Sequence, residues 1–116
     1  MNPAHDAIEQ RRARRKRVDF TAMVTDAISG QPFGQLANLS ASGMLLISTH
    51  APRSEAIYQL RLALSNASQP QHVELGVQEQ WHAPAATPGQ VWAGYRIIAI
   101  NEADAMRLDA WLTQPG

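Results

Sequence analysis

The chain has 116 residues, of which 45% are hydrophobic and none is cysteine. This length predicts one domain, the hydrophobic content excludes a disordered chain, and the absence of cysteine excludes disulfides and thiolate metal sites. The net charge is zero, but residues 1–17 carry six basic and two acidic groups, a net charge of +4. We therefore divide the chain into a basic N-terminal arm, 1–17, and a mildly acidic domain, 18–114.

Six short apolar or alternating runs are separated by turn and loop residues, which is the pattern of β-strands. The runs cover residues 18–25, 33–39, 44–48, 57–64, 72–81 and 91–100. Ser29-Gly30 is typical of a hairpin turn between the first two runs, and residues 83–89 predict a loop before the last run. Strands at this spacing predict a small antiparallel β-barrel.

Two of the predicted strands carry details that a structure can test. In the fifth run the odd-numbered residues share one face, and Glu79 interrupts this otherwise apolar series. We therefore expect a bulge near Gly76 or exposure of the far end, near Trp81. In the sixth run, we expect Ile97 and Ile98 in the core.

The end of the chain changes to helical spacing. Asn101 suits a helix N-cap, and acidic residues follow it in the first turn, where negative charge suits the helix dipole. This pattern predicts a helix over about 102–113 that packs Met106 and Trp111 on the sheet. The predicted fold class is therefore all-β: a small six-stranded antiparallel barrel with a short C-terminal α-helix.

Residues that could carry catalysis or hold a metal are scattered along the chain. The four histidines have no metal-ligand spacing, and the sequence contains no HExxH, GxSxG, P-loop or GxGxxG motif. We therefore expect no enzymatic activity, no metal and no cofactor. No apolar run approaches the ~18 residues of a membrane span, and the N-terminus lacks a signal-peptide core, which predicts a cytoplasmic protein.

Two short motifs carry the functional prediction. The run from Arg11 to Arg17 holds six of the ten Lys and Arg residues, and arginine both binds phosphate bidentately and stacks on flat rings. Further along, residues 38–43 read Asn-Leu-Ser-Ala-Ser-Gly. Asn38 and Ser40 share one side of a strand end and can pair with a guanine edge, while Gly43 allows a positive φ and close backbone approach. Alone, the first motif is equally explained as a solvated tail, and the second is better explained as an ordinary polar turn.

In this order and spacing, the two motifs make the chain resemble the PilZ domain, a bacterial receptor for cyclic di-GMP. The family has RxxxR followed by [D/N]xSxxG, and residues 11–15 and 38–43 satisfy these patterns. The resemblance implies a cyclic di-GMP site formed by Arg11, Arg12, Arg15, Asn38, Ser40 and Gly43, with Arg14 and Arg17 as further candidates. In family members the second arginine often directly precedes the first strand, as Arg17 does here. The clamp is therefore formed either by Arg11 and Arg15 or by Arg12 and Arg17.

The resemblance also implies a role. We expect a stand-alone receptor and adaptor that binds cyclic di-GMP and relays the signal to an unidentified downstream protein, in motility, exopolysaccharide synthesis or virulence. Two alternatives stay open: an adaptor that binds an acidic partner without nucleotide, and a nucleic-acid binder that uses the basic arm. The acidic domain and the aromatic content of only 6% count against nucleic acid.

Overall fold

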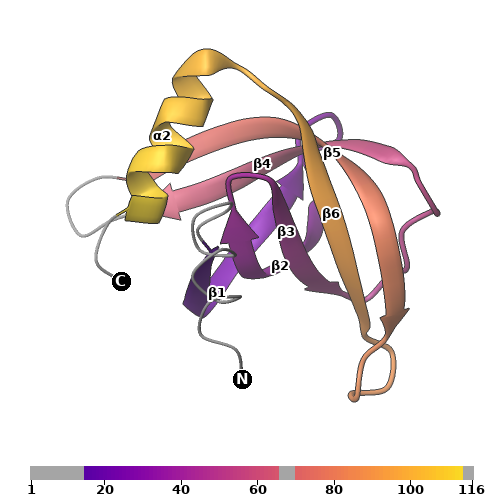
Figure 1. The fold of residues 1–116 in the computed structure, drawn as a ribbon. Coiled ribbons are helices and arrows are strands. Elements are labelled where there is room, and N and C mark those ends of the chain that lie inside the picture. The colour runs from indigo at the N-terminus through magenta and orange to yellow at the C-terminus, as the bar shows by residue number, and fades with distance from the viewer. Residues whose placement is uncertain (1–14, 66–69, 114–116) are drawn as a thin grey trace, which may run out of the picture.

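Six antiparallel strands close into a barrel, and one helix lies at an end of it, beside the end of β4 (Figure 1). The computed structural model describes the backbone of residues 15–65 and 70–113, with side chains described for 22–64 and 72–113. The elements are β1 (Arg15–Asp26), β2 (Pro32–Ser40), β3 (Gly43–Ser48), β4 (Ile57–Ser65), β5 (Pro70–Pro84), β6 (Val91–Ile100) and α2 (Glu102–Thr113). The order around the barrel is β1-β2-β3-β6-β5-β4. The predicted fold class is confirmed.

Alternation along the strands directs one set of side chains into the barrel, where they form a single core. Its most buried members are Val24, Leu39, Leu46, Leu60, Leu62, Leu64, Val73, Leu75 and Val77. Fully burying one such side chain contributes about 1.5–3 kcal/mol. Phe33, Tyr58 and Tyr95 pack together against this core, with ring centroids 4.9–6.2 Å apart. Burial raises the pKa of the Tyr95 hydroxyl, which therefore stays protonated.

The barrel closes where β1 meets β4, and this junction is short. In the described residues it consists of three residue pairs, which join Val24–Asp26 to Leu60–Leu62. The neighbouring β4–β5 ladder has nine pairs, from Ile57 to Ser65. The strand that continues from the basic arm is thus the strand that seals the barrel.

The helix begins where the sequence predicts, but it buries a different face. Asn101 Oδ1 accepts a hydrogen bond from the Asp104 N–H at 2.7 Å, which confirms the predicted N-cap. Leu108 and Trp111 are buried, whereas Met106 is 68% exposed, so the prediction that Met106 packs on the sheet was wrong. The buried face of the helix starts at Asp104. Because this first buried residue is polar, the spacing of apolar residues alone does not identify the buried face.

Asp104 joins the start of α2 to the sheet. Its carboxylate accepts hydrogen bonds from the Glu74 N–H at 3.1 Å, from Arg107 Nη1 at 2.6 Å and from Asn101 Nδ2 at 3.1 Å. Burial by itself would raise the pKa of Asp104, but these three donors outweigh burial and hold the pKa below its ordinary value. The ionised carboxylate therefore fixes the helix N-terminus on β5.

Two strands are longer than predicted. β1 begins at Arg15 rather than Val18, and β5 continues to Pro84, through residues predicted as loop. The cause is pairing: Ala83 lies opposite Trp92, so β6 extends β5 beyond its apolar run. Where the end of a strand is set by pairing with its neighbour, the residues at that end give little indication of it in the sequence.

Bulges between β5 and β6 explain the other differences. The register shifts between Gly76 and Val77, where a bulge was predicted in β5, but the extra residue is on the neighbouring strand: Ile98 of β6 lies between two pairs. Ile98 is 41% exposed, so its predicted place in the core was wrong. A second shift, between Glu79 and Trp81, separates two residues that shared a predicted face. Glu79 is buried, whereas Trp81, at the far end expected to be exposed, is 49% exposed.

Candidate functional site

The two sequence motifs meet in the pairing of β1 with β2. Arg15 lies opposite Ser40 in this ladder. Arg17 lies opposite Asn38. The end of the basic run and the polar turn are therefore on adjacent strands, about 4.8 Å apart.

Part of the predicted site cannot be placed. Arg11, Arg12 and Arg14 lie outside the described residues. Of Arg15 and Arg17, the structure describes the backbone positions alone. The choice of clamp arginines therefore stays a prediction.

The Ser40 hydroxyl shapes the turn between β2 and β3. Ser40 Oγ accepts hydrogen bonds from the N–H groups of Ser42 and Gly43, at 3.3 and 3.2 Å. It also lies 3.3 Å from the Gly43 carbonyl, to which it can donate. Ser40 has no exposed surface. Its side chain thus closes the hairpin locally, as Ser does in many turns.

Gly43 is required by close approach rather than by its backbone angle. Among the described glycines, Gly30 and Gly89 have positive φ, and Gly43 does not, so the positive φ suggested for it was wrong. A Cβ at Gly43 would lie 2.6 Å from the carbonyl oxygen of Tyr95 on β6. The Ile97 N–H donates to the Ser42 carbonyl at 2.9 Å, which ties the turn further to β6. Close packing on β6 is the reason for the glycine.

The outer face beyond the turn carries an aromatic ring that the sequence did not indicate. Asn38 lies opposite Leu45, and Leu45 lies opposite Gly94 of β6. Trp81 is opposite Gly94 in turn, and a Cβ at Gly94 would overlap its indole ring. The ring therefore covers Gly94 on the same side of the sheet as Asn38. The sequence allowed exposure near Trp81 but did not place its ring beside the turn, because that place follows from the β5–β6 register.

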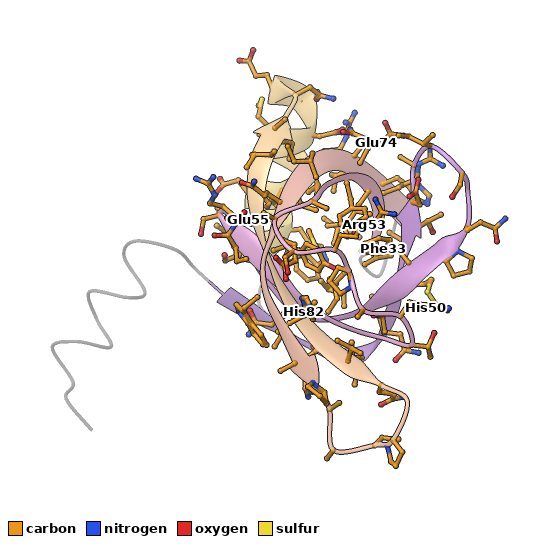
Figure 2. All side chains as sticks on the ribbon, turned by 90° about the vertical axis from the view of Figure 1, so that its right-hand side faces the viewer. Phe33, His50, Arg53, Glu55, Glu74 and His82 are labelled. Atoms are coloured by element: carbon orange, nitrogen blue, oxygen red, sulfur yellow. The ribbon has the colours of Figure 1, made fainter. Side chains whose placement is uncertain are left out.

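A buried carboxylate on β5 fixes the loop between β3 and β4. Glu79 Oε1 accepts from the Glu55 N–H at 2.8 Å, and Glu79 Oε2 lies 2.5 Å from His82 Nδ1. Figure 2 labels the two partners of this carboxylate, Glu55 and His82. The Glu55 N–H, and then His82, hold the pKa of Glu79 below its ordinary value despite its burial. Glu55 has a positive φ of 61°, which is unfavourable for a non-glycine residue. The carboxylate thus stabilises a strained loop.

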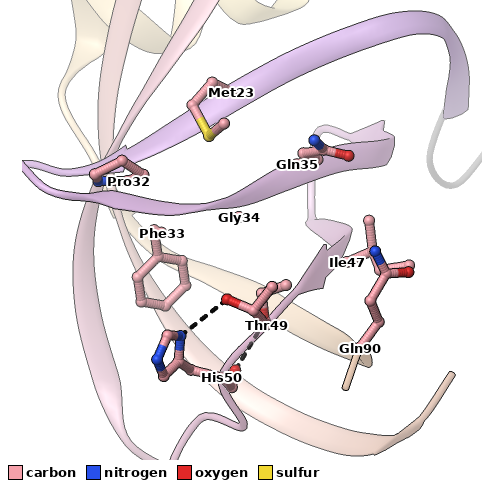
Figure 3. A pocket seen from close by; sticks show the side chains of 10 residues that line it. Met23, Pro32, Phe33, Gly34, Gln35, Ile47, Thr49, His50 and Gln90 are labelled. Atoms are coloured by element: carbon pink, nitrogen blue, oxygen red, sulfur yellow. Dashed lines mark hydrogen bonds between the residues drawn. The ribbon is translucent and has the colours of Figure 1, made fainter. Parts of the chain in front are cut away.

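A groove of about 330 Å³ lies at the opposite end of the β2–β3 hairpin from the polar turn. It is lined by Met23, Pro32, Phe33, Gly34, Gln35, Ile47, Ser48, Thr49, His50 and Gln90. Figure 3 shows Phe33 beside His50, whose Nδ1 lies 3.0 Å from Thr49 Oγ1. No lysine, arginine or carboxylate is among these lining residues, so the groove has little to attract a phosphate.

The described part of the chain holds no group of three or more His, Asp or Glu side chains placed to bind a metal ion. None of its helices combines the length and the apolar character needed to cross a membrane. Cellular location stays a prediction.

Comparison with known proteins assigns the family. The sequence-family model of the PilZ domain matches residues 9–114, so the chain belongs to the PilZ domain family, a class of receptor and adaptor domains. A similar solved structure is the Bacillus subtilis inhibitor of motility (MotI/DgrA), with a TM-score of 0.69 and 12% sequence identity. The match covers 86% of this chain and 48% of that one, so the chain spans about half its length, and the likeness establishes the fold. No curated protein matches this chain.

Proposed function

We propose that this protein is a receptor for cyclic di-GMP that passes the signal to a partner protein. The observation that carries the proposal is the register of β1 on β2. Arg15 lies opposite Ser40, so the cationic run meets the turn that follows Asn38. Membership of the PilZ family, over a range that includes both motifs, supports the same ligand.

The proposed site divides the ligand chemistry between its parts. Arginines of the run 11–17 bind the phosphodiester groups, because guanidinium forms charge-assisted, bidentate hydrogen bonds with phosphate. Asn38 supplies a donor and an acceptor for a guanine edge. Trp81 offers a half-exposed ring on which a base can stack. Ser40 acts by holding the turn, since its hydroxyl is engaged there.

We further propose that bound nucleotide fixes the arm against β2 and so creates a surface for the partner. Ordering of a segment by a ligand is an established way to switch a protein interface. Motility proteins are the first partners to test, because the similar MotI/DgrA is named an inhibitor of motility. Exopolysaccharide synthesis and virulence are the other outputs that the family suggests.

Calorimetry tests the proposal directly. The full chain should bind cyclic di-GMP with micromolar or tighter affinity, and GTP and a short DNA should bind far more weakly. Binding to DNA alone would instead identify a nucleic-acid protein. Absence of all binding would leave an adaptor that works without nucleotide.

A further inference from the structure

We infer that Arg96 of β6 is a second phosphate-binding residue of the site, on the other side of the turn from the basic run. This inference rests on the proposed function. Arg96 belongs to neither sequence motif, and its place beside the turn follows from the barrel topology, which pairs β3 with β6.

Arg96 lies directly next to the turn. Gly43 and Arg96 are opposite each other in the β3–β6 ladder. Tyr95 is buried in the barrel and Arg96 is exposed, so the Arg96 side chain is on the outer face. Gly43 carries no side chain, so none at that position separates the turn from the guanidinium. A ligand seated on the turn therefore comes within reach of Arg96.

The guanidinium of Arg96 is engaged with a neutral partner. Arg96 Nη2 donates to Gln78 Oε1 at 3.3 Å, slightly beyond the usual length of such a bond. Arg61 and Arg107, by contrast, each form a 2.6 Å ion pair with a carboxylate. Within the described residues, Arg96 forms no ion pair. The guanidinium has five N–H donors, so a phosphate can bind to others while Nη2 keeps its bond to Gln78, and no ion pair among the described residues is broken.

Gln78 holds Arg96 in this position. The Gln78 Nε2 group donates to the Glu55 carbonyl at 3.1 Å. A carbonyl can only accept, so the amide nitrogen faces Glu55 and the amide oxygen faces Arg96. Glu55 is itself anchored by Glu79. Gln78 is thus a positioning residue whose orientation is fixed by the loop between β3 and β4.

The basic run and Arg96 lie on either side of the turn, so their long side chains can approach two phosphodiester groups of one ligand from opposite sides. We therefore assign one phosphodiester to the basic run and the other to Arg96.

Calorimetry with cyclic di-GMP on three full-length proteins tests the assignment: wild type, Arg96→Gln and Arg61→Gln. Arg61 is the matched control, an exposed sheet arginine whose loss changes the net charge equally. Arg96→Gln should bind roughly 10-fold more weakly, as expected for a lost charge-assisted bond. Arg61→Gln should stay within about 2-fold, since surface ion pairs contribute little.

The outcomes separate this inference from the proposed function. Wild-type binding with an unchanged Arg96→Gln affinity overturns the role of Arg96 and leaves the receptor intact. An equal loss in Arg61→Gln also overturns it, because the effect is then general charge. Absence of wild-type binding overturns both proposals.

A double-mutant cycle tests Gln78. Gln78→Ala should weaken binding about 3-fold in the wild type and have no effect in Arg96→Gln, because residues that act through one another are not additive. An equal loss in both backgrounds would show that Gln78 does not act through Arg96. Arg96→Lys should recover part of the affinity, since it keeps the charge without the planar fork.

Discussion

The β2–β3 hairpin has two very different ends. One end is the polar turn at 40–43, closely packed on β6 and adjacent to the basic run. The other end is an uncharged groove of about 330 Å³ lined by Phe33 and Met23. The groove offers no charged side chain to an anion, whereas the polar turn lies beside the strand that continues from the basic run. For a flat, anionic ligand, strand register is therefore a better guide than cavity volume.

The largest expected effect compares glycines at the two ends. Gly43→Ala places a Cβ 2.6 Å from the Tyr95 oxygen, whereas Gly34→Ala, in the groove, places one 3.1 Å from the Ile47 oxygen. Gly43→Ala should cost about 1–3 kcal/mol of stability and lose cyclic di-GMP binding, because β3 and β6 move apart. Gly34→Ala should cost less. Thermal melting and calorimetry measure both, and a Gly43→Ala protein that melts like wild type would refute the close-packing argument.

Next in size is the loss of an arginine from the basic run. Arg15→Ala should weaken cyclic di-GMP binding by about 1.5–3 kcal/mol, because a charge-assisted bond to phosphate is lost. Lys16→Ala, which removes the same charge, should cost less. Affinities of the two variants decide between a specific clamp and general attraction. If Arg17→Ala abolishes binding and Arg11→Ala does not, the clamp is formed by Arg12 and Arg17.

Two side chains of β2 compare the ends within one strand. Asn38→Ala should weaken binding by about 1–3 kcal/mol, since a polar ligand group is left unpaired. Gln35→Ala, in the groove, should leave the affinity unchanged. Calorimetry on the pair measures the contrast, and a loss in Gln35→Ala alone would move the ligand to the groove.

The smallest effect concerns the pH dependence of stability and the loop between β3 and β4. The pKa of Glu79 is lower in the folded protein, so its stabilisation is present above the unfolded pKa and is lost as pH falls through the folded pKa. Glu79→Gln should therefore show a flatter loss of stability with acid than wild type. Melting temperatures from neutral to acidic pH test this, and parallel curves would contradict it.

The sequence predicted the fold well wherever a strand alternates regularly. Leu60, Leu62 and Leu64 alternate along the strand predicted at 57–64 and are buried, and the helix begins after Asn101. Bulges limited the prediction of which side chains are buried, because a bulge depends on the partner strand as well as on the local residues. The exposure of Ile98 is an example, since only the β5–β6 register explains it.

The candidate site divides in the same way. The motif residues Asn38, Ser40 and Gly43 could be found in the sequence, because their types and spacing are local. Trp81 and Arg96 could not, because the place of Trp81 depends on the register shift between β5 and β6, and Arg96 lies beside the turn only through the pairing of β3 with β6.

The short junction of β1 with β4 is the place where the barrel can open most easily. Three residue pairs, at Val24–Asp26, hold it in the described residues, and the cheapest local opening of a protein occurs where few hydrogen bonds must break. Opening there would release β1 from β4, while β2 to β6 keep their longer ladders. The strand that closes the barrel thus also continues from the basic arm. A nucleotide that holds the arm against β2 would therefore make separation of β1 from β4 less favourable. Amide hydrogen exchange of Val24 and Thr25 is then a readout of occupancy at the other end of the strand.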